Sequence, residues 1–118
     1  GQVFSDAADA VMAAAGMDAG YLEDMSCFTV DIRIRFLNEL HAGERIRVET
    51  RVTEAKGKKL RLFHSLMRAD GTEAATGEQL LLHVDMATRR ASEPPQWMAE
   101  KLTTLQGRHA EVASAEDG

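Results

Sequence analysis

Hydrophobic and polar residues alternate along most of the chain between residues 27 and 85, which is the pattern of strands with one buried face. The alternation in "CFTVDIRIRF" and "RIRVETRVTEA" predicts strands over 27–36 and 45–55. The stretch "KLRLFHSLMRADGTEAATGEQLLLHVD" predicts two more strands joined at 69–72, each about twice the usual length of ~5–6 residues. The positions predicted to face inward on the four strands are Phe28, Val30, Ile32, Ile34 and Phe36; Ile46, Val48, Thr50 and Val52; Leu60, Leu62, His64 and Leu66; and Leu80, Leu82 and Val84.

A helical pattern precedes the strands. In "VFSDAADAVMAAAG", Val3, Ala7 and Val11 recur at helical spacing, and Gly16 is a suitable C-cap residue. Alanine dominates the surface of this helix, so a sheet can approach its axis closely and curl around it. We therefore expect the helix over about 3–15 to cover the apolar face of a four-stranded antiparallel meander, an α+β fold.

The carboxyl-terminal part has a different composition. "QWMAEKLTTLQ" follows two prolines and predicts a helix over about 96–106. Residues 108–118 have a composition that need not be ordered, so a flexible tail is expected there. At 118 residues, the chain is expected to form one domain over 1–107 with its core in 1–91.

Composition narrows the functional classes. The net charge is -5 and the acidic and basic residues are interspersed, so no basic footprint for nucleic acid is present. No apolar run approaches the ~18 residues of a membrane span, and a single cysteine, Cys27, excludes an intrachain disulfide. We expect a soluble, cytoplasmic protein that binds neither nucleic acid nor membrane.

Several stretches together resemble one known family. The order and spacing of "HAGERIRVETRV", "KKLRLFHSL", a "DG" hairpin and "ATGEQLLLHVDMATRRA" resemble the hotdog-fold acyl-CoA thioesterases of the 4-hydroxybenzoyl-CoA thioesterase type. The branch around betainyl-CoA thioesterase is the most similar, and the likeness covers about residues 1–91. The resemblance implies a long central helix wrapped by a curved antiparallel sheet of four long strands. It also implies hydrolysis of a small acyl-CoA to the acid and CoA, no cofactor, and a homodimer or dimer of dimers in which strands 27–36 pair.

In the resembling family, a further strand and a loop carrying a catalytic acidic residue precede the helix, and no stretch of this sequence matches them. The expectation is therefore that the catalytic loop lies upstream of Gly1, and that the 118 residues alone bind CoA esters weakly and barely hydrolyse them. An alternative is a noncatalytic hotdog module that binds acyl-CoA or serves dimerisation. A third is another one-helix, curved-sheet fold used as a small-molecule pocket.

Two carboxylates and one basic cluster are the candidate site residues. Asp6 and Asp9 lie on the predicted helix, where some hotdog enzymes carry a catalytic carboxylate. The helix dipole at Asp6 and the position of Asp9 outside the apolar stripe favour solvent-facing positions instead. In "KGKKLR", Lys58, Lys59 and Arg61 are candidates for the phosphates of CoA, because the resembling family places the nucleotide near this hairpin. Basic residues at a hairpin tip also serve solubility alone.

His64 is the remaining candidate for substrate binding. Alternation places it among leucines on an inner face, where a histidine is either a hydrogen-bonded core residue or a substrate contact. The other histidines show no metal-ligand spacing, and Cys27 has no partner that would make it a nucleophile. We therefore expect no metal site.

Overall fold

The computed structural model describes residues 2–41 and 43–105 of the chain. The elements in chain order are α1 (Gln2–Ala14), α2 (Ala19–Asp24), β1 (Met25–Phe36), β2 (Ile46–Lys56), β3 (Lys59–Arg68), β4 (Glu73–Asp85) and β5 (Arg90–Ala91). Residues 96–105 form a further helical segment. The predicted tail over 108–118 lies outside the described residues.

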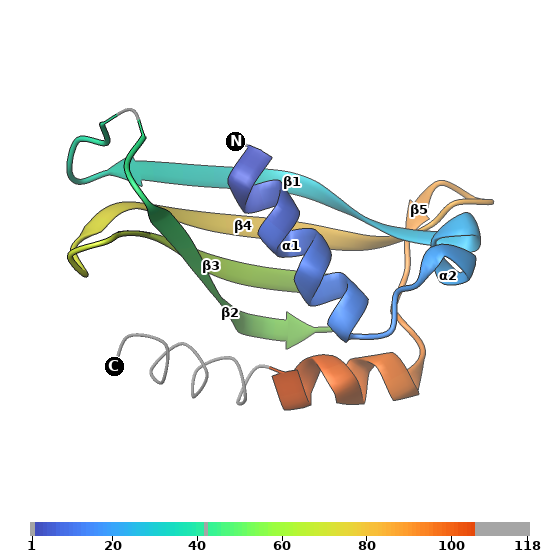
Figure 1. The fold of residues 1–118 in the computed structure, drawn as a ribbon. Helices are drawn as coiled ribbons and strands as arrows, with labels where there is room; N and C mark the ends of the chain where they lie inside the picture. Colours follow the sequence, from blue (N-terminus) through green and yellow to red (C-terminus); the bar gives the residue numbers. More distant parts are fainter. Residues whose placement is uncertain (1, 42, 106–118) are drawn as a thin grey trace.

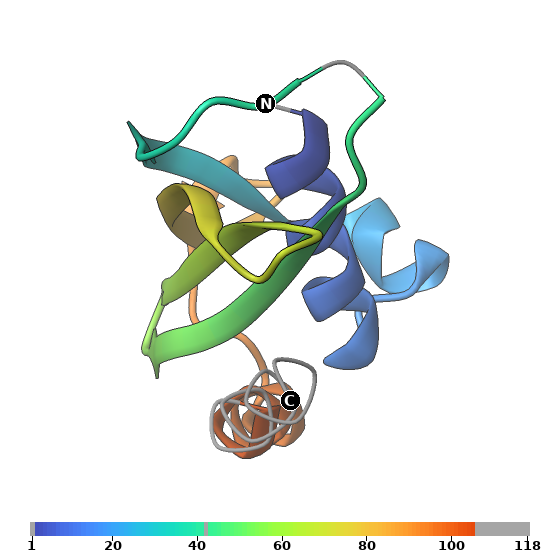
Figure 2. The same ribbon diagram turned by 60° about the vertical axis from the view of Figure 1, so that its left-hand side comes forward.

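Helix α1 lies across one face of the sheet, which curves around it (Figures 1 and 2). Its buried stripe is made of Phe4, Ala8, Val11 and Ala15, and the three small or branched side chains let the sheet approach closely. The helix ends before Gly16, whose φ of 97° is a conformation that glycine adopts without strain. A central helix wrapped by an antiparallel sheet of four long strands is therefore confirmed.

The strands pair in the order β1-β4-β3-β2, and every pair is antiparallel. The two long strands β3 and β4 and the turn at 69–72 are as predicted. In the turn, Asp70 accepts hydrogen bonds from the backbone and hydroxyl of Thr72, and Gly71 adopts a φ of 89°. The predicted meander of all four strands is wrong. The chain leaves β1 and crosses to the far edge before β2 begins, so β1 and β2 form opposite edges of the sheet.

The inner face of β4 differs from the prediction. Gln79, Leu81 and His83 are buried, whereas the residues predicted to face the helix are only half-buried: Leu80, Leu82 and Val84. The register explains the difference, because Leu81 pairs with the inward-facing Leu60 of β3. Three consecutive leucines carry no alternation, so the sequence did not define which of them faces inward.

A bulge interrupts β1. Thr29 pairs with Leu81 and Asp31 pairs with Leu80, so Val30 is an extra residue. Thr29 therefore shares the helix side of the sheet with Leu81, and Phe28 shares the outer side with Leu82. The prediction that the alternation places Phe28 inward and Thr29 outward is wrong, because one extra residue reverses the faces.

The helical segment 96–105 completes the core. Met98 and Leu102 are 0% and 5% exposed and belong to the same cluster of buried side chains as Leu60, Leu62 and Leu81. Figure 1 shows this segment, in orange, running beside the β2 edge of the sheet. It therefore covers an end of the core that α1 does not reach.

Candidate functional site

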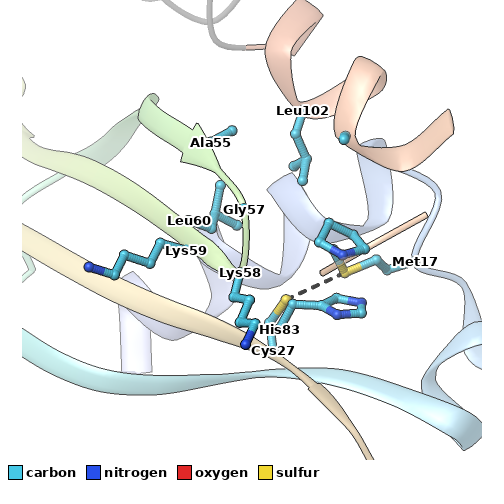
Figure 3. A pocket seen from close by; sticks show the side chains of 11 residues that line it. Met17, Cys27, Ala55, Gly57, Lys58, Lys59, Leu60, His83 and Leu102 are labelled. Atoms are coloured by element: carbon cyan, nitrogen blue, oxygen red, sulfur yellow. Dashed lines mark hydrogen bonds between the residues drawn. The ribbon is translucent and has the colours of Figure 1, made fainter. Parts of the chain in front are cut away.

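One pocket lies beside the turn between β2 and β3. The turn contains Gly57 and Lys58, and the positive φ of 58° at Gly57 matches the first central position of a type II′ turn. The pocket encloses about 340 Å³ including its open mouth. Its lining includes Lys58, Lys59, Cys27, His83 and Met17 (Figure 3). Two of the three predicted basic residues therefore line a common hollow.

The two lysines differ in direction. The backbone carbonyl of Lys58 accepts a hydrogen bond of 2.9 Å from the amide of His83, which fixes the turn against β4. Figure 3 shows the side chain of Lys58 extending along the same side as Cys27 and His83, whereas that of Lys59 extends away from them. Lys58 is therefore the better placed of the two for a ligand in this pocket.

Arg61 belongs to the outer face of the sheet. It lines a different hollow with Asp31, and its Nε lies 3.0 Å from Oε1 of Glu54. Both side chains of this ion pair are about half exposed, so water screens the pair and it adds little stability. Arg61 lies one pleat beyond Lys59 on the same strand, but its charge already has a partner.

His83 is buried in the pocket wall with both ring nitrogens occupied. Its Nδ1 lies 2.9 Å from the carbonyl of Ser92, which only accepts, so Nδ1 carries the proton. Nε2 then accepts the hydrogen bond from the hydroxyl of Tyr21. Burial is the main cause that raises the pKa of Tyr21, so this hydroxyl keeps its proton.

Cys27 is an unreactive member of the same pocket. Burial raises the pKa of its thiol to about 11. Its Sγ lies 3.8 Å from Sδ of Met17, and both atoms pack as soft apolar groups. The thiol is therefore protonated at neutral pH and is no nucleophile.

A second polar group crosses the core beneath α1. Thr50 of β2, His64 of β3, Gln79 of β4 and Thr29 of β1 form a continuous hydrogen-bonded chain. The successive donor-acceptor distances are 2.9, 2.8 and 2.7 Å. We call these four residues the cross-sheet chain.

His64 is the centre of the cross-sheet chain. It is 0% exposed, and the ring of Phe4 stacks on it with centroids 4.9 Å apart. Burial is the main cause that lowers its pKa, so the imidazole is neutral. Contact with a substrate, the role predicted for His64, would require this packing to open, and the contact stays a prediction.

Asp6 and Asp9 lie on the exposed side of α1. The buried stripe of the helix runs through Phe4, Ala8 and Val11, so both carboxylates point away from the sheet. They are not brought together with the lysines of the pocket or with the cross-sheet chain. Among the residues that the structure describes, no group of acidic, histidine and cysteine side chains is arranged to hold a metal ion.

Comparison with known proteins identifies the family. The model of the thioesterase-like superfamily matches residues 1–102. The chain belongs to this superfamily. An L-carnitine dehydrogenase/betainyl-CoA thioesterase of Agrobacterium fabrum is 46% identical over 99 residues, which are 82% of this chain and 20% of that protein. A betainyl-CoA thioesterase of Pseudomonas aeruginosa is 36% identical over 93 residues, 76% of this chain and 58% of that protein.

The thioesterase-like chain also resembles solved structures. A Staphylococcus aureus protein determined in complex with CoA has a TM-score of 0.84 and 25% identity, covering 89% of this chain and 68% of that one. This likeness confirms the hotdog fold. The chain spans about a fifth of the length of the first curated relatives that it matches. No helix in the described part of the chain is long and apolar enough to cross a membrane.

Sequence reasoning missed most polar members of both groups in this thioesterase-like domain. The sequence placed three of these residues on the wrong face or gave them no role: Gln79, His83 and Thr29. The reason is that the pairing of β1 with β4 was not predicted. The available signal was the presence of polar residues inside otherwise apolar strands, which usually indicates a hydrogen-bonded network.

Proposed function

We propose that this chain is an acyl-CoA thioesterase domain that hydrolyses a small acyl-CoA to the acid and CoA. The observation that carries the proposal is the similarity to relatives named betainyl-CoA thioesterase, which extends over most of this chain. The solved structure in complex with CoA supports the same class of ligand. A betainyl group is a candidate acyl group, because it is the one in the names of these relatives.

Lys58, Lys59 and Arg61 are the proposed contacts for the phosphates of CoA. Lys58 and Lys59 line the pocket at the β2–β3 turn, and Arg61 follows on the outer face. Arg61 would have to exchange its ion pair with Glu54 for a phosphate, which is a small loss at an exposed site. We expect Lys58 to contribute most, and His64 to act from within the core.

The proposed assembly is a homodimer, or a dimer of such dimers, formed through β1 in the cytoplasm. β1 is an edge strand, and its large apolar side chains are unusually open: Phe28, Val30, Ile32, Ile34 and Phe36 are 39% to 80% exposed. A long apolar edge invites pairing with another strand. A second copy of β1 running antiparallel would pair with this edge through its backbone and extend the sheet.

The dimer is tested by sedimentation at micromolar concentration. Ile34→Lys places a charge in the apolar edge and is expected to shift the chain to monomer. Leu22→Lys on α2 is the matched control, because Leu22 is also exposed, at 41%, but belongs to the helix before β1 and not to the strand that would pair. A monomeric wild-type chain would contradict the proposed assembly.

The catalytic carboxylate is proposed to lie upstream of Gly1, with Asp6 and Asp9 as the candidates inside the chain. The assay is thiol release from acetyl-CoA, longer acyl-CoA esters and betainyl-CoA, by the 118 residues and by a version extended upstream. Turnover of order 1 per second or more by the extended form alone supports the upstream carboxylate. The same rate in the 118-residue form would assign the catalytic carboxylate to α1, and loss of activity in Asp6→Asn or Asp9→Asn would then identify which aspartate it is.

Binding distinguishes the enzyme from a noncatalytic module. Lys58→Ala with Lys59→Ala is expected to weaken CoA binding several-fold. The salt dependence of binding should also fall, because salt screens the lysine–phosphate attraction that the double variant lacks. Arg45→Ala, an exposed cation in the loop before β2, is the control. CoA binding without hydrolysis in both forms would favour the module, and absence of both would overturn the proposal.

A further inference from the structure

The cross-sheet chain has no evident structural necessity. His64 and Gln79 occupy interior positions and are 0% and 4% exposed, among buried leucines and alanines. Their hydrogen bonds satisfy their own polar groups, but apolar residues of similar shape would be about as stable there. The network joins β2 to β1 across the whole sheet. A functional contact is therefore expected at one of its two end residues, Thr50 or Thr29.

The direction of the hydrogen bonds can be assigned. The amide oxygen of Gln79 only accepts, so Nε2 of His64 carries the proton and Nδ1 accepts from the hydroxyl of Thr50. The Nε2 amide group of Gln79 in turn donates to Oγ1 of Thr29 at 2.7 Å. The hydroxyl proton of Thr29 is therefore directed away from Gln79 and is available to another acceptor.

Thr29 lies where such an acceptor has access. It is exposed at the β1 edge, and the bulge at Val30 turns it to the helix side of the sheet. Ile32 and Ile34 follow on the same side and are each 39% exposed, since α1 packs mainly on β2 and β3. One oriented donor at the end of an open apolar strip suits a carbonyl oxygen attached to an apolar chain.

We propose that the hydroxyl of Thr29 donates a hydrogen bond to the carbonyl oxygen of the acyl thioester, and that Gln79 and His64 are positioning residues that aim it. The inference rests on the proposed function. The carbonyl oxygen gains negative charge when a nucleophile attacks, so a fixed donor stabilises the transition state more than the bound ester. No proton leaves Thr29 in this role.

The test compares two stable CoA derivatives. One is a ketone analogue in which a methylene replaces the thioester sulfur, and the other is an S-alkyl CoA that lacks the carbonyl oxygen. Titration calorimetry should show that wild-type protein prefers the ketone by roughly threefold to tenfold, the worth of one hydrogen bond. Thr29→Val should lose the preference without changing S-alkyl CoA binding, and Thr29→Ser should keep it.

Two further variants separate positioning from packing. Gln79→Glu presents only acceptors to Thr29, so the hydroxyl proton turns inward and the ketone preference is expected to fall although the shape is kept. Thr76→Val is the control for Thr29→Val: it makes the same replacement on the outer face of β4 and should leave the ketone preference unchanged. In an active form, Thr29→Val should lower kcat about 100-fold with little change in KM, the size of effect typical of one lost oxyanion donor.

The outcomes are distinguishable. If the wild-type protein binds neither derivative, the proposed function is wrong and this inference falls with it. If both derivatives bind and Thr29→Val retains the ketone preference, the inference alone is wrong. If Thr29→Ser loses the preference as fully as Thr29→Val, Thr29 acts through its shape and not through its hydroxyl.

Discussion

Gly77 on β4 permits the contact between α1 and the cross-sheet chain. It pairs with His64 on one side and Ile34 on the other. A Cβ at this position would lie 2.8 Å from Cε2 and 2.9 Å from Cδ2 of Phe4, whose ring stacks on His64. Alanine would therefore displace Phe4 from its place between the helix and the sheet.

The two effects of Gly77→Ala oppose each other. Alanine is favoured over glycine within a strand by roughly 0.5–1 kcal/mol. Overpacking a core costs typically about 1–3 kcal/mol. We expect the second effect to dominate, because the clashing atoms belong to a ring buried at 5% exposure. The net loss of about 1–2 kcal/mol corresponds to a Tm lower by roughly 5–10 °C for a domain of this size.

A double-mutant cycle identifies the cause. Urea unfolding is followed by circular dichroism in the wild type, Gly77→Ala, Phe4→Ala and the double variant. Once Phe4 is truncated, Gly77→Ala should become neutral or stabilising. Gly20→Ala is the control, because its Cβ meets only Asp18 Oδ1, at 3.5 Å, and alanine favours the helix. An equal loss from Gly77→Ala in both backgrounds would refute the clash with Phe4.

Three further predictions concern titratable groups. At pH 8, the thiol of Cys27 should react with a disulfide reagent about two hundred times more slowly than free cysteine, because its pKa is about 11, and urea should restore the rate. Because the pKa of His64 is lowered in the folded protein, the free energy of unfolding is highest above the unfolded pKa of ~6.5 and falls as the pH drops below it. His64→Gln should therefore flatten the pH dependence of the urea midpoint between about pH 7 and 5, and an unchanged slope would contradict the lowered pKa of His64. The hydrogen bond from Arg68 lowers the pKa of Glu44, so Glu44→Gln should reduce thermal stability at neutral pH. The variant should match the wild type once the pH falls well below ~4, because Glu44 is then protonated and as uncharged as glutamine.

Much of the fold followed from local patterns. The leucines of β3 alternate with polar residues, and Leu60, Leu62 and Leu66 are buried as predicted. The alanine-rich helix and the Asp-Gly turn carry equally local signals. The bulge at Val30 and the face of β4 depend on pairing between distant strands, which alternation within one strand does not encode.

The candidate site was less predictable than the fold. The lysines of the β2–β3 turn became candidates because a charged turn is a local feature. The link from His64 through Gln79 to Thr29 requires knowing that β4 lies between β3 and β1. The sequence separates these residues widely, so their hydrogen bonds follow from topology rather than from any motif.

The pairing of β1 with β4 also affects how the protein is made. Met25 pairs with Asp85 and Phe36 with Ala75, so β1 emerges from the ribosome well before its partner exists. At about 5–20 residues per second, its apolar side chains wait several seconds for that partner. Pairing between distant segments is also slow to form. The newly made chain therefore has an interval in which β1 is a natural target for chaperones or for another nascent copy.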